Sequence, residues 1–339
     1  MKLIKTEEAV GHVLCHDLTQ IIKDQYKDAR FRKGHVVTEE DIPVLLSMGK
    51  EHLYVWEMTP GMLHENDGAE RLCALCANEY MDRSEVKEGK IELKAACDGL
   101  FRVNSEKLIA VNSIEDLMIA TRKGGTAVRK GDKLAGMRVI PLIIPEEKLR
   151  AAEDAVGTAP LLELKPWVRK TAAIVATGSE VKKGLIQDTF TPVVRDKLAA
   201  YGIETISVAY SGDGVEHVAN AVTEARKTGA DVILCTGGMS VDPDDNTPGG
   251  IKVSGAKIVT YGAPVLPGAM FLLGYYEDGT PVMGLPGCVM YAGATIFDLV
   301  LPFVAADVPV TRAQIVALGE GGLCLGCQPC HWPNCPFGR

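Results

Sequence analysis

The second half of the chain carries short apolar runs separated by segments of helical periodicity. The runs at 171–178, 204–210 and 230–238 are apolar almost throughout, which is typical of buried strands. The segments 191–202 and 215–229 repeat apolar residues at helical spacing and end at glycine, which predicts two amphipathic helices. Strand, helix, strand, helix, strand in this order favours βαβ units, so the pattern predicts a parallel sheet.

Boundary residues define two of the predicted helices more closely. Thr191 is expected to cap the helix over 191–202, with Pro192 in its first turn and Gly202 beyond its end. A last helix is predicted over 288–304, after a Gly-Leu-Pro-Gly sequence. The predicted fold class is therefore α/β, with a parallel-sheet αβα sandwich in the second half of the chain.

The first 160 residues have a different pattern, in which short apolar or alternating runs lie between glycine and aspartate turns. The runs within 90–104 and 127–144 predict β-hairpins. Short helices are predicted at 39–49, 68–81 and 145–156. Together these patterns predict a β-rich N-terminal domain over 1–160, an α/β domain over 169–310 and a cysteine-rich tail over 320–339.

Composition narrows the classes of partner. The chain has 339 residues, a formal net charge of −8 at pH 7 and no basic tract, so nucleic acid is not an expected partner. The longest mostly apolar stretch, 294–306, is interrupted by Asp298 and is too short to span a membrane. Lys5, Glu7 and Glu8 interrupt the apolar pattern before the core of a signal peptide could form. We therefore expect no membrane partner and a cytoplasmic location.

Three polar loops follow the predicted strands, at 177–188, 211–214 and 236–250. In an open parallel sheet, ligands bind at the carboxyl ends of the strands, where such loops meet. Glycine lets the backbone approach an anion and present N–H groups to it. The aspartates of the third loop suit a Mg²⁺ ion that bridges carboxylate and phosphate. The same residue types also form ordinary solvated turns, so both interpretations stay open on composition.

The third loop, Thr-Gly-Gly-Met-Ser-Val-Asp-Pro-Asp-Asp-Asn-Thr-Pro over 236–248, resembles the signature of the molybdopterin-binding domain. Molybdopterin adenylyltransferases, molybdopterin molybdenumtransferases and CinA-like proteins share this domain, and the paired aspartates are most similar to the CinA-like version. The first loop and the Pro-Gly loops within 264–270 and 284–289 resemble those of the molybdenumtransferases. The resemblance covers 169–306, and parts of 1–160 resemble the N-terminal domains of molybdenumtransferases.

The resemblance implies a site and a function. Asp188 and Asp245 would be the catalytic residues, holding Mg²⁺ and positioning the phosphate of molybdopterin or of its adenylate. The residues implied in substrate binding are Thr177, Gly178, Glu180, Gly212, Asp213, Thr236, Gly237, Gly238, Ser240, Thr247, Pro286 and Gly287. The implied function is molybdenum cofactor biosynthesis, in which a molybdopterin molybdenumtransferase-like enzyme inserts molybdate. Because the relatives form dimers or trimers, a homo-oligomer is also expected.

Departures from the molybdenumtransferase pattern keep two alternatives open. Ala269 follows the first Pro-Gly loop, where transferases often have lysine, and Cys288-Val289 replaces a common Asn-Pro in the second. These changes favour a non-catalytic molybdopterin carrier or redox sensor, which would dock a molybdoenzyme. The Asp244-Asp245 pair favours a CinA-like nucleotide pyrophosphatase.

Four of the ten cysteines crowd the end of the chain, at Cys324, Cys327, Cys330 and Cys335. Without a secretion signal, close-set cysteines are more typical of metal ligands than of disulfides. The spacing is one residue longer than a ferredoxin run, so a [4Fe–4S] cluster is one prediction. The alternatives are tetrahedral Zn²⁺, with His331 as a substitute ligand, and a disordered reducing tail. By contrast, Cys73 and Cys76 are predicted to pack in a core.

Overall fold

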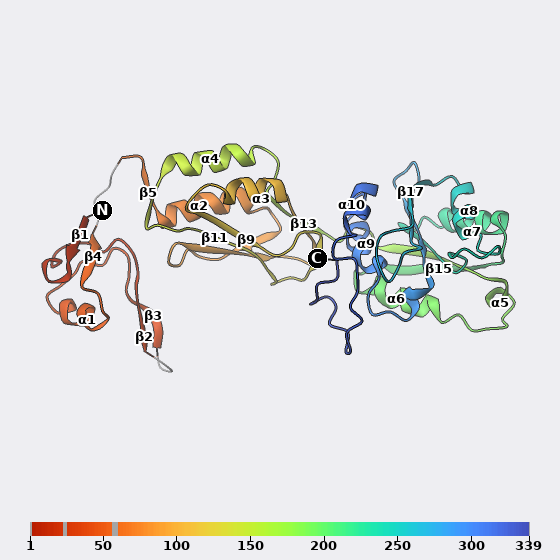
Figure 1. Ribbon diagram of the computed structural model, residues 1–339, viewed down its shortest axis with the longest axis horizontal. Coiled ribbons are helices and arrows are strands. Elements are labelled where there is room, and N and C mark those ends of the chain that lie inside the picture. The colour runs from red at the N-terminus through yellow and green to blue at the C-terminus, as the bar shows by residue number, and fades with distance from the viewer. Residues whose placement is uncertain (1, 23–25, 56–59, 339) are drawn as a thin grey trace. The chain divides into compact units, whose positions relative to one another are not determined.

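The computed structural model of the protein describes residues 2–22, 26–55 and 60–338. The chain divides into two compact units (Figure 1). The first comprises Met1–Ala96, Val103–Gly124 and Lys130–Glu163, and the second comprises Cys97–Arg102, Gly125–Arg129 and Leu164–Arg339. Within the described ranges, no helix is both long and apolar enough to cross a membrane.

The second unit is built on a six-stranded sheet in the order β15-β14-β16-β19-β18-β17. Its strands are β14 (Thr171–Thr177), β15 (Glu204–Ser211), β16 (Val232–Thr236), β17 (Lys257–Tyr261), β18 (Leu272–Tyr275) and β19 (Pro281–Leu285). Strands β15, β14, β16 and β19 are parallel to one another, whereas β18 is antiparallel to both of its neighbours. The predicted parallel sheet is confirmed, with three further strands at one side, β19, β18 and β17, that the apolar pattern did not predict.

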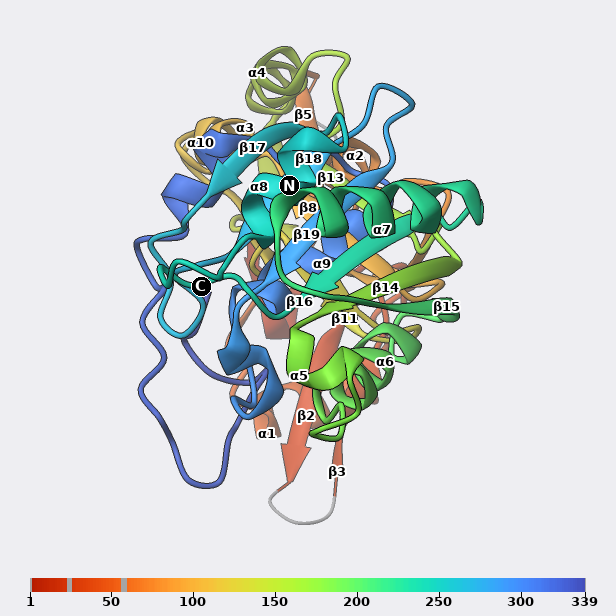
Figure 2. The same cartoon turned by 90° about the vertical axis from the view of Figure 1, so that its right-hand side faces the viewer.

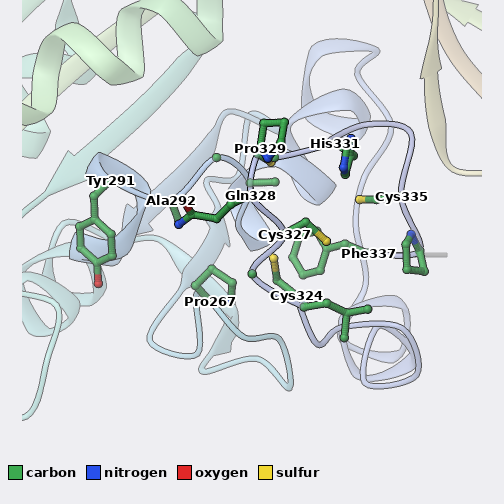
Figure 3. Close-up of a pocket in the computed structure, with 16 residues that line it drawn as sticks. Pro267, Tyr291, Ala292, Cys324, Cys327, Gln328, Pro329, His331, Cys335 and Phe337 are labelled. Carbon is green, nitrogen blue, oxygen red and sulfur yellow. The ribbon is translucent and has the colours of Figure 1, made fainter.

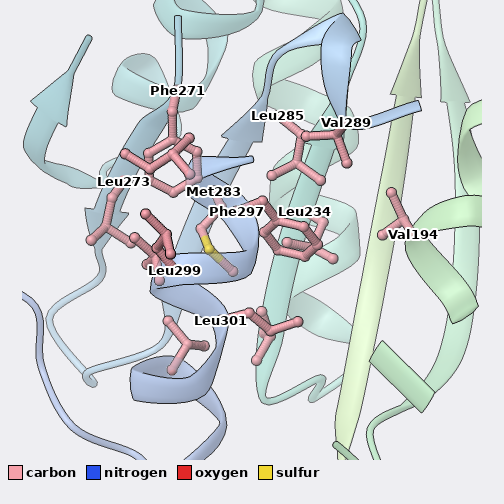
Figure 4. Close-up of a cluster of buried hydrophobic side chains, with 14 of the residues drawn as sticks. Val194, Leu234, Phe271, Leu273, Met283, Leu285, Val289, Phe297, Leu299 and Leu301 are labelled. Atoms are coloured by element: carbon pink, nitrogen blue, oxygen red, sulfur yellow. The ribbon is translucent and has the colours of Figure 1, made fainter. Parts of the chain in front are cut away.

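Helices cover both faces of this sheet, as Figure 2 shows. On one face, α6 (Phe190–Ala199) and α9 (Ile296–Ala305) contribute to an apolar core, in which Phe297 and Leu301 pack with Leu234 of β16 (Figure 4). On the other face, α7 (Val215–Lys227) and α8 (Thr247–Val253) form a second core that includes Ile233. Successive residues of β16 are thus buried on opposite faces, which explains its unbroken apolar sequence. The predicted αβα sandwich is confirmed.

Two helix boundaries differ from the prediction. The segment 288–304 is not one helix: it forms a 3₁₀ turn, η2 (Gly287–Met290), and then α9. The break arises because Thr295 and Asp298 form a capping box that starts a new helix. Helix α6, predicted over 191–202, begins at Phe190. Thr191 therefore lies inside the helix and is not its cap.

Small sheets and three longer helices make up most of the first unit. The strands of the first half of the chain are β1 (Lys2–Lys5), β2 (Leu18–Ile22), β3 (Tyr26–Phe31), β4 (His52–Val55), β5 (Met62–His64), β6 (Met81–Arg83), β7 (Lys90–Ala95), β8 (Gly99–Val103), β9 (Leu117–Thr121), β10 (Thr126–Val128), β11 (Lys133–Val139), β12 (Ile143–Pro145) and β13 (Leu162–Pro166). Its helices are η1 (Thr6–Glu8), α1 (Asp41–Ser47), α2 (Glu65–Cys76), α3 (Ser105–Asn112) and α4 (Glu146–Val156). The β-rich character of this part of the chain is as predicted.

The predicted hairpins are wrong, although their strands exist. Strand β7 lies between β6 and β11, whereas β8 lies between β10 and β13 in another sheet. The strands β10, β11 and β12 likewise belong to three different sheets. Apolar patterning shows where strands occur but not which strands pair, because pairing depends on contacts far apart in sequence.

Leu234 offers a test of the central sheet, because it is fully buried in β16. We expect Leu234→Ala to lower the free energy of unfolding by about 2–5 kcal/mol. The shortened side chain would leave a cavity in the core that the surrounding side chains cannot fully fill. Urea unfolding followed by tryptophan fluorescence measures this loss, because Trp167 and Trp332 pack against the same core. Val253→Ala, at a site 63% exposed, is the control and should change stability by about 0.5 kcal/mol or less. Equal effects of the two substitutions would contradict the assignment of this core.

Candidate functional site

The polar loops predicted from the sequence meet at one edge of the sheet. Because β14, β15, β16 and β19 are parallel neighbours, their carboxyl ends lie on the same side. The segments that leave this edge are 178–189 after β14, 212–214 after β15, 237–246 after β16 and 286–287 after β19. Every residue implied in substrate binding lies in or next to these four segments. We call this side of the sheet the carboxyl edge.

A buried hydroxyl cluster joins the ends of β14 and β16 to the start of α8. The Thr177 hydroxyl lies 3.0 Å from the carbonyl oxygen of Thr236 and 2.9 Å from the hydroxyl of Thr247. The Thr247 hydroxyl in turn lies 2.9 Å from the carbonyl oxygen of Gly237. All three threonines are buried, so these contacts keep polar groups satisfied and fix the loop that begins at Gly237.

Two glycines, Gly237 and Gly238, allow the loop after β16 to pack directly against Thr177 and Thr247. Gly237 and Gly238 have φ angles of +84° and +58°, in the region that favours glycine. A Cβ atom at Gly237 would lie 2.3 Å from the carbonyl oxygen of Thr177, and one at Gly238 would lie 2.7 Å from the Thr247 hydroxyl. The Gly-Gly pair is therefore required by the packing of β14 against β16, whatever the loop binds.

The loops after β14 and β15 are tied together by Ser179 and Asp213. The Ser179 amide donates to the Asp213 carboxylate at 3.2 Å, and the Asp213 amide donates to the Ser179 hydroxyl at 3.4 Å. The Gly178 amide donates to the carbonyl of Ser211 at 3.1 Å. The carboxylate of Asp213 thus already has a structural partner within the protein.

A lysine also lies at this edge, and the sequence reasoning did not single it out. A Cβ atom built on Gly212 would lie 3.9 Å from the Lys182 ammonium nitrogen. Lys182 is exposed, in the short helix α5 (Ser179–Lys182) that also contains Glu180. The carboxyl edge therefore presents a cation as well as carboxylates, although the whole chain is acidic. Its signal in the sequence was the Lys-Lys pair within the first loop.

Asp188 forms hydrogen bonds with the backbone at the start of α6. Its Oδ1 accepts hydrogen bonds from the amides of Phe190 and Thr191, both at 3.0 Å. This carboxylate therefore fills the capping role that was predicted for Thr191. Its Oδ2 is buried without a hydrogen-bond partner among the described residues, and so is the hydroxyl oxygen of Thr191. The start of α6 thus contains two buried oxygen atoms that could each still form a hydrogen bond or bind a ligand.

Asp245 lies in the loop after β16, which Tyr261 fastens to the edge strand β17. The Asp245 Oδ2 accepts a hydrogen bond from the Asp242 amide at 3.2 Å, and the Tyr261 hydroxyl donates to the carbonyl of Met239 at 3.0 Å. Burial, and then the negative charge of Asp245, raise the pKa of the Tyr261 phenol. Tyr261 belongs to the site as a positioning residue. It was missed because its strand was not predicted.

The second Pro-Gly loop completes the edge beside α6. Pro286 is buried, whereas Gly287 is exposed and would meet nothing within 4 Å if it carried a Cβ atom. The Thr189 hydroxyl lies 3.2 Å from the Met290 sulfur of η2, which connects this loop to the segment containing Asp188. Gly287 thus leaves open space at the edge.

The two aspartates predicted to share Mg²⁺ lie in the loops of adjacent strands, β14 and β16. In the part of the chain that the structure describes, no group of three or more His, Cys, Asp or Glu side chains is placed to hold a metal ion. Ser240 is exposed, whereas Thr236 is buried at the end of its strand. The roles of these residues in binding and catalysis stay predictions.

Comparison with known proteins identifies the α/β region. Residues 173–306 match the family described as a probable molybdopterin binding domain. This match is to a molybdopterin-binding domain and covers less than half of the chain. Residues 3–57 match a domain of unknown function, DUF8806. The family match covers the carboxyl edge, from the end of β14 to the Pro-Gly loops.

Curated relatives match only about a quarter of this chain. A CinA-like protein from Desulfosudis oleivorans is 41% identical over 86 residues, which is 25% of this chain and 21% of the relative. A probable FAD synthase from Caenorhabditis briggsae is 32% identical over 84 residues, or 25% of this chain and 16% of the relative. The chain thus aligns with about a fifth or less of the length of these relatives.

Solved structures of molybdopterin-related proteins are also similar. The CinA protein from Thermoplasma acidophilum covers 40% of this chain and 98% of its own, at 17% identity and a TM-score of 0.34. The molybdopterin biosynthesis MoeA protein from Pyrococcus horikosii covers 91% of this chain and 75% of its own, at 15% identity and a TM-score of 0.34. The family assignment rests on the sequence match over 173–306.

Gly237 allows a direct test of the packing at the carboxyl edge. Gly237→Ala would introduce both an unfavourable φ and an overlap with Thr177, whereas Gly279→Ala would introduce only the φ penalty, because Gly279 has a φ of +82° and open space around it. We expect a loss of about 1–2 kcal/mol for Gly279→Ala and a further loss of about 1–3 kcal/mol for Gly237→Ala. Urea unfolding measures both, and equal losses would show that the close approach is absent.

Proposed function

We propose that the molybdopterin-binding domain binds molybdopterin or adenylated molybdopterin at the carboxyl edge, together with Mg²⁺, and inserts molybdate. The family match over 173–306 carries this proposal. The geometry supports it, because loops from four parallel strands meet at one edge and two of them carry glycines that bring backbone close to neighbouring groups.

One observation supports the proposal of a divalent cation at Asp188. One of its carboxylate oxygens is occupied by two backbone amides, but the other is buried and lacks a hydrogen-bond partner among the described residues. A buried carboxylate oxygen without a partner is costly unless a ligand or water satisfies it. Asp188, with Asp245 from the adjacent loop, would hold the ion. When bound, Mg²⁺ would neutralise negative charge on the phosphate oxygens of the substrate.

Other residues of the edge would bind and orient the substrate. The turn at Gly237 and Gly238 is fixed by the hydroxyl cluster below it, so its backbone is already ordered before a ligand arrives. Preorganised amides of this kind stabilise anions without paying for reorganisation. The Lys182 ammonium is close enough to Gly212 to pair with a phosphate bound over that loop.

Turnover would consist of cleavage of the phosphate anhydride of the adenylate. A water or molybdate oxygen would form a bond to phosphorus as the bond to the leaving phosphate breaks, so no covalent enzyme intermediate is required. The acidic loop containing Asp245 would orient the attacking oxygen. This chemistry would make the protein a transferase of molybdenum cofactor biosynthesis.

A CinA-like nucleotide pyrophosphatase is the second candidate, favoured by the 41% identity to a CinA-like protein over 86 residues. Incubation with adenylated molybdopterin and with ADP-ribose separates the candidates. Cleavage of ADP-ribose supports the pyrophosphatase, cleavage of the adenylate alone supports the molybdenumtransferase, and binding without cleavage of either supports a molybdopterin carrier, which would dock a molybdoenzyme. A homo-oligomer is proposed by analogy, and sedimentation equilibrium measures it.

Asp188→Asn separates metal binding from helix capping. The asparagine carbonyl can still accept from the amides of Phe190 and Thr191, so stability should change by less than about 1 kcal/mol. Loss of the charge should abolish the Mg²⁺-dependent part of molybdopterin binding, weakening the affinity by about tenfold or more. Isothermal titration of the full chain with molybdopterin, with and without Mg²⁺, measures the effect.

Asp196→Asn is the matched control, because Asp196 is exposed on the same helix and the substitution makes the same change in net charge. It should leave Mg²⁺-dependent binding unchanged. The assignment of Asp188 is wrong if both variants bind molybdopterin as the unsubstituted protein does. It is also wrong if both weaken binding equally, since net charge alone would then explain the loss.

A further inference from the structure

The cysteines of the chain fall into two groups. Cys76 and Cys235 are buried, and burial raises the pKa of each thiol to about 12. Such thiols are inert members of a core. Cys327 and Cys330 are exposed near the end of the chain. The exposed thiols can reach metal ions and alkylating reagents in solution, whereas the buried thiols cannot.

The cysteine-rich segment is docked on the second unit. Phe337 is 3% exposed and belongs to the same apolar core as Leu299 of α9. The Gly338 amide donates to the carbonyl of Gly321 at 2.9 Å, and Trp332 packs edge-on against Phe337 at 5.7 Å between ring centroids. The disordered tail considered from the sequence is therefore not what the structure shows. Both ends of the segment are anchored, so the loop between them is closed.

This closed loop contacts the two Pro-Gly loops of the molybdopterin-binding domain. The Cys324 amide donates to the carbonyl of Leu266, next to the first Pro-Gly loop, at 2.8 Å. A Cβ atom on Gly293 would lie 2.7 Å from the Cys330 sulfur, so the loop packs closely against Gly293. Gly293 follows η2, which begins at the second Pro-Gly loop. The segment thus joins two elements that flank the carboxyl edge.

The four thiols line a single pocket of about 470 Å³. Figure 3 shows Cys324, Cys327 and Cys335 around it, with His331 beside them, and Cys330 also lines it. Cys324 and Cys335 pack partly against the apolar core, whereas the other two cysteines lie in the exposed part of the loop. The thiols face the same space, but no three of them are already gathered at metal-binding distance in the described ranges.

We propose that this pocket is a site for a thiophilic metal, either one Zn²⁺ ion or an iron–sulfur cluster, that closes the loop on binding. Cys324 and Cys335 would supply two thiolates from fixed positions, and Cys327 and Cys330 would move in from the exposed loop. Each thiol loses its proton as its sulfur–metal bond forms. The proton goes to water when Zn²⁺ binds, and to the small-molecule thiolate that leaves when a preassembled cluster is transferred, so neither route needs a redox step. Zinc and iron–sulfur clusters share this all-thiolate chemistry.

Metal binding would stiffen the loops that flank the carboxyl edge, because the segment is bonded to Leu266 and rests on Gly293. Binding energy at a structural thiolate site contributes directly to the stability of the segment that supplies the ligands. The proposal does not depend on which ligand the carboxyl edge binds, so its test can fail without affecting the proposed function.

Metal analysis of the full chain, purified without oxygen, tests the proposal. We expect about one zinc per chain, or iron with an equal amount of sulfide and a broad visible absorbance. Either result supports the thiolate site and says which metal fills it. The double variant Cys327→Ser/Cys330→Ser should lose the metal, and Cys97→Ser, outside the pocket, should retain it. Retention of the metal by the double variant, or absence of both metals from the unsubstituted protein after reconstitution with each, overturns the proposal.

Thiol alkylation supplies a readout that does not depend on native metal content. The apoprotein is loaded with Zn²⁺ or with a preassembled iron–sulfur cluster held by small-molecule thiolates, and alkylation of Cys327 and Cys330 is followed by mass spectrometry. We expect metal to slow their alkylation by about tenfold or more, since bound thiolate is masked, and to leave Cys97 unaffected. Equal alkylation rates at Cys327 and Cys330 with and without both metals would contradict the proposal. Unchanged urea unfolding of the double variant in its metal-free form excludes a folding defect.

Discussion

The close approach of β14 to β16 at their carboxyl ends is the constraint on which the site depends. The Thr177 hydroxyl contacts Thr236 and Thr247, and the main chain at Gly237 passes against the Thr177 carbonyl with no space for a side chain. These contacts set the path of the acidic loop and the start of α8. Because the two strands are adjacent and parallel, the loops containing Asp188 and Asp245 both leave the same edge of the sheet.

An acidic chain that receives a phosphate ligand has to offset its own charge locally. The carboxyl edge has three means of doing so: ordered backbone at glycine turns, the Lys182 ammonium, and the unpartnered oxygen of Asp188 that a cation could satisfy. A cation there would explain why a carboxylate lies beside the proposed phosphate site. Asp188 holds the start of α6 with one oxygen, and its other oxygen is buried without a hydrogen-bond partner among the described residues.

The sequence predicted the parallel sheet, its two covering helices and the loops of the carboxyl edge, because buried parallel strands are apolar at every position and glycine marks their ends. It did not predict that α6 begins ahead of Thr191, because the amides of Phe190 and Thr191 are already bonded to the Asp188 carboxylate. The split of 288–304 depends on side-chain bonds of Thr295 and Asp298. Tyr261 could not be predicted as part of the site, because its contact with Met239 joins strand β17 to a loop from another strand.

Amide hydrogen exchange locates ligand sites directly, and the proposed ligand site of this protein lies at the carboxyl edge. The full chain is exchanged with and without molybdopterin and Mg²⁺, and peptides are compared by mass spectrometry. We predict slower exchange in 177–191, 211–214 and 236–250, with little change in 1–55. Exchange that is unchanged in these three segments at saturating molybdopterin, or protection confined to other parts of the chain, would contradict the central claim.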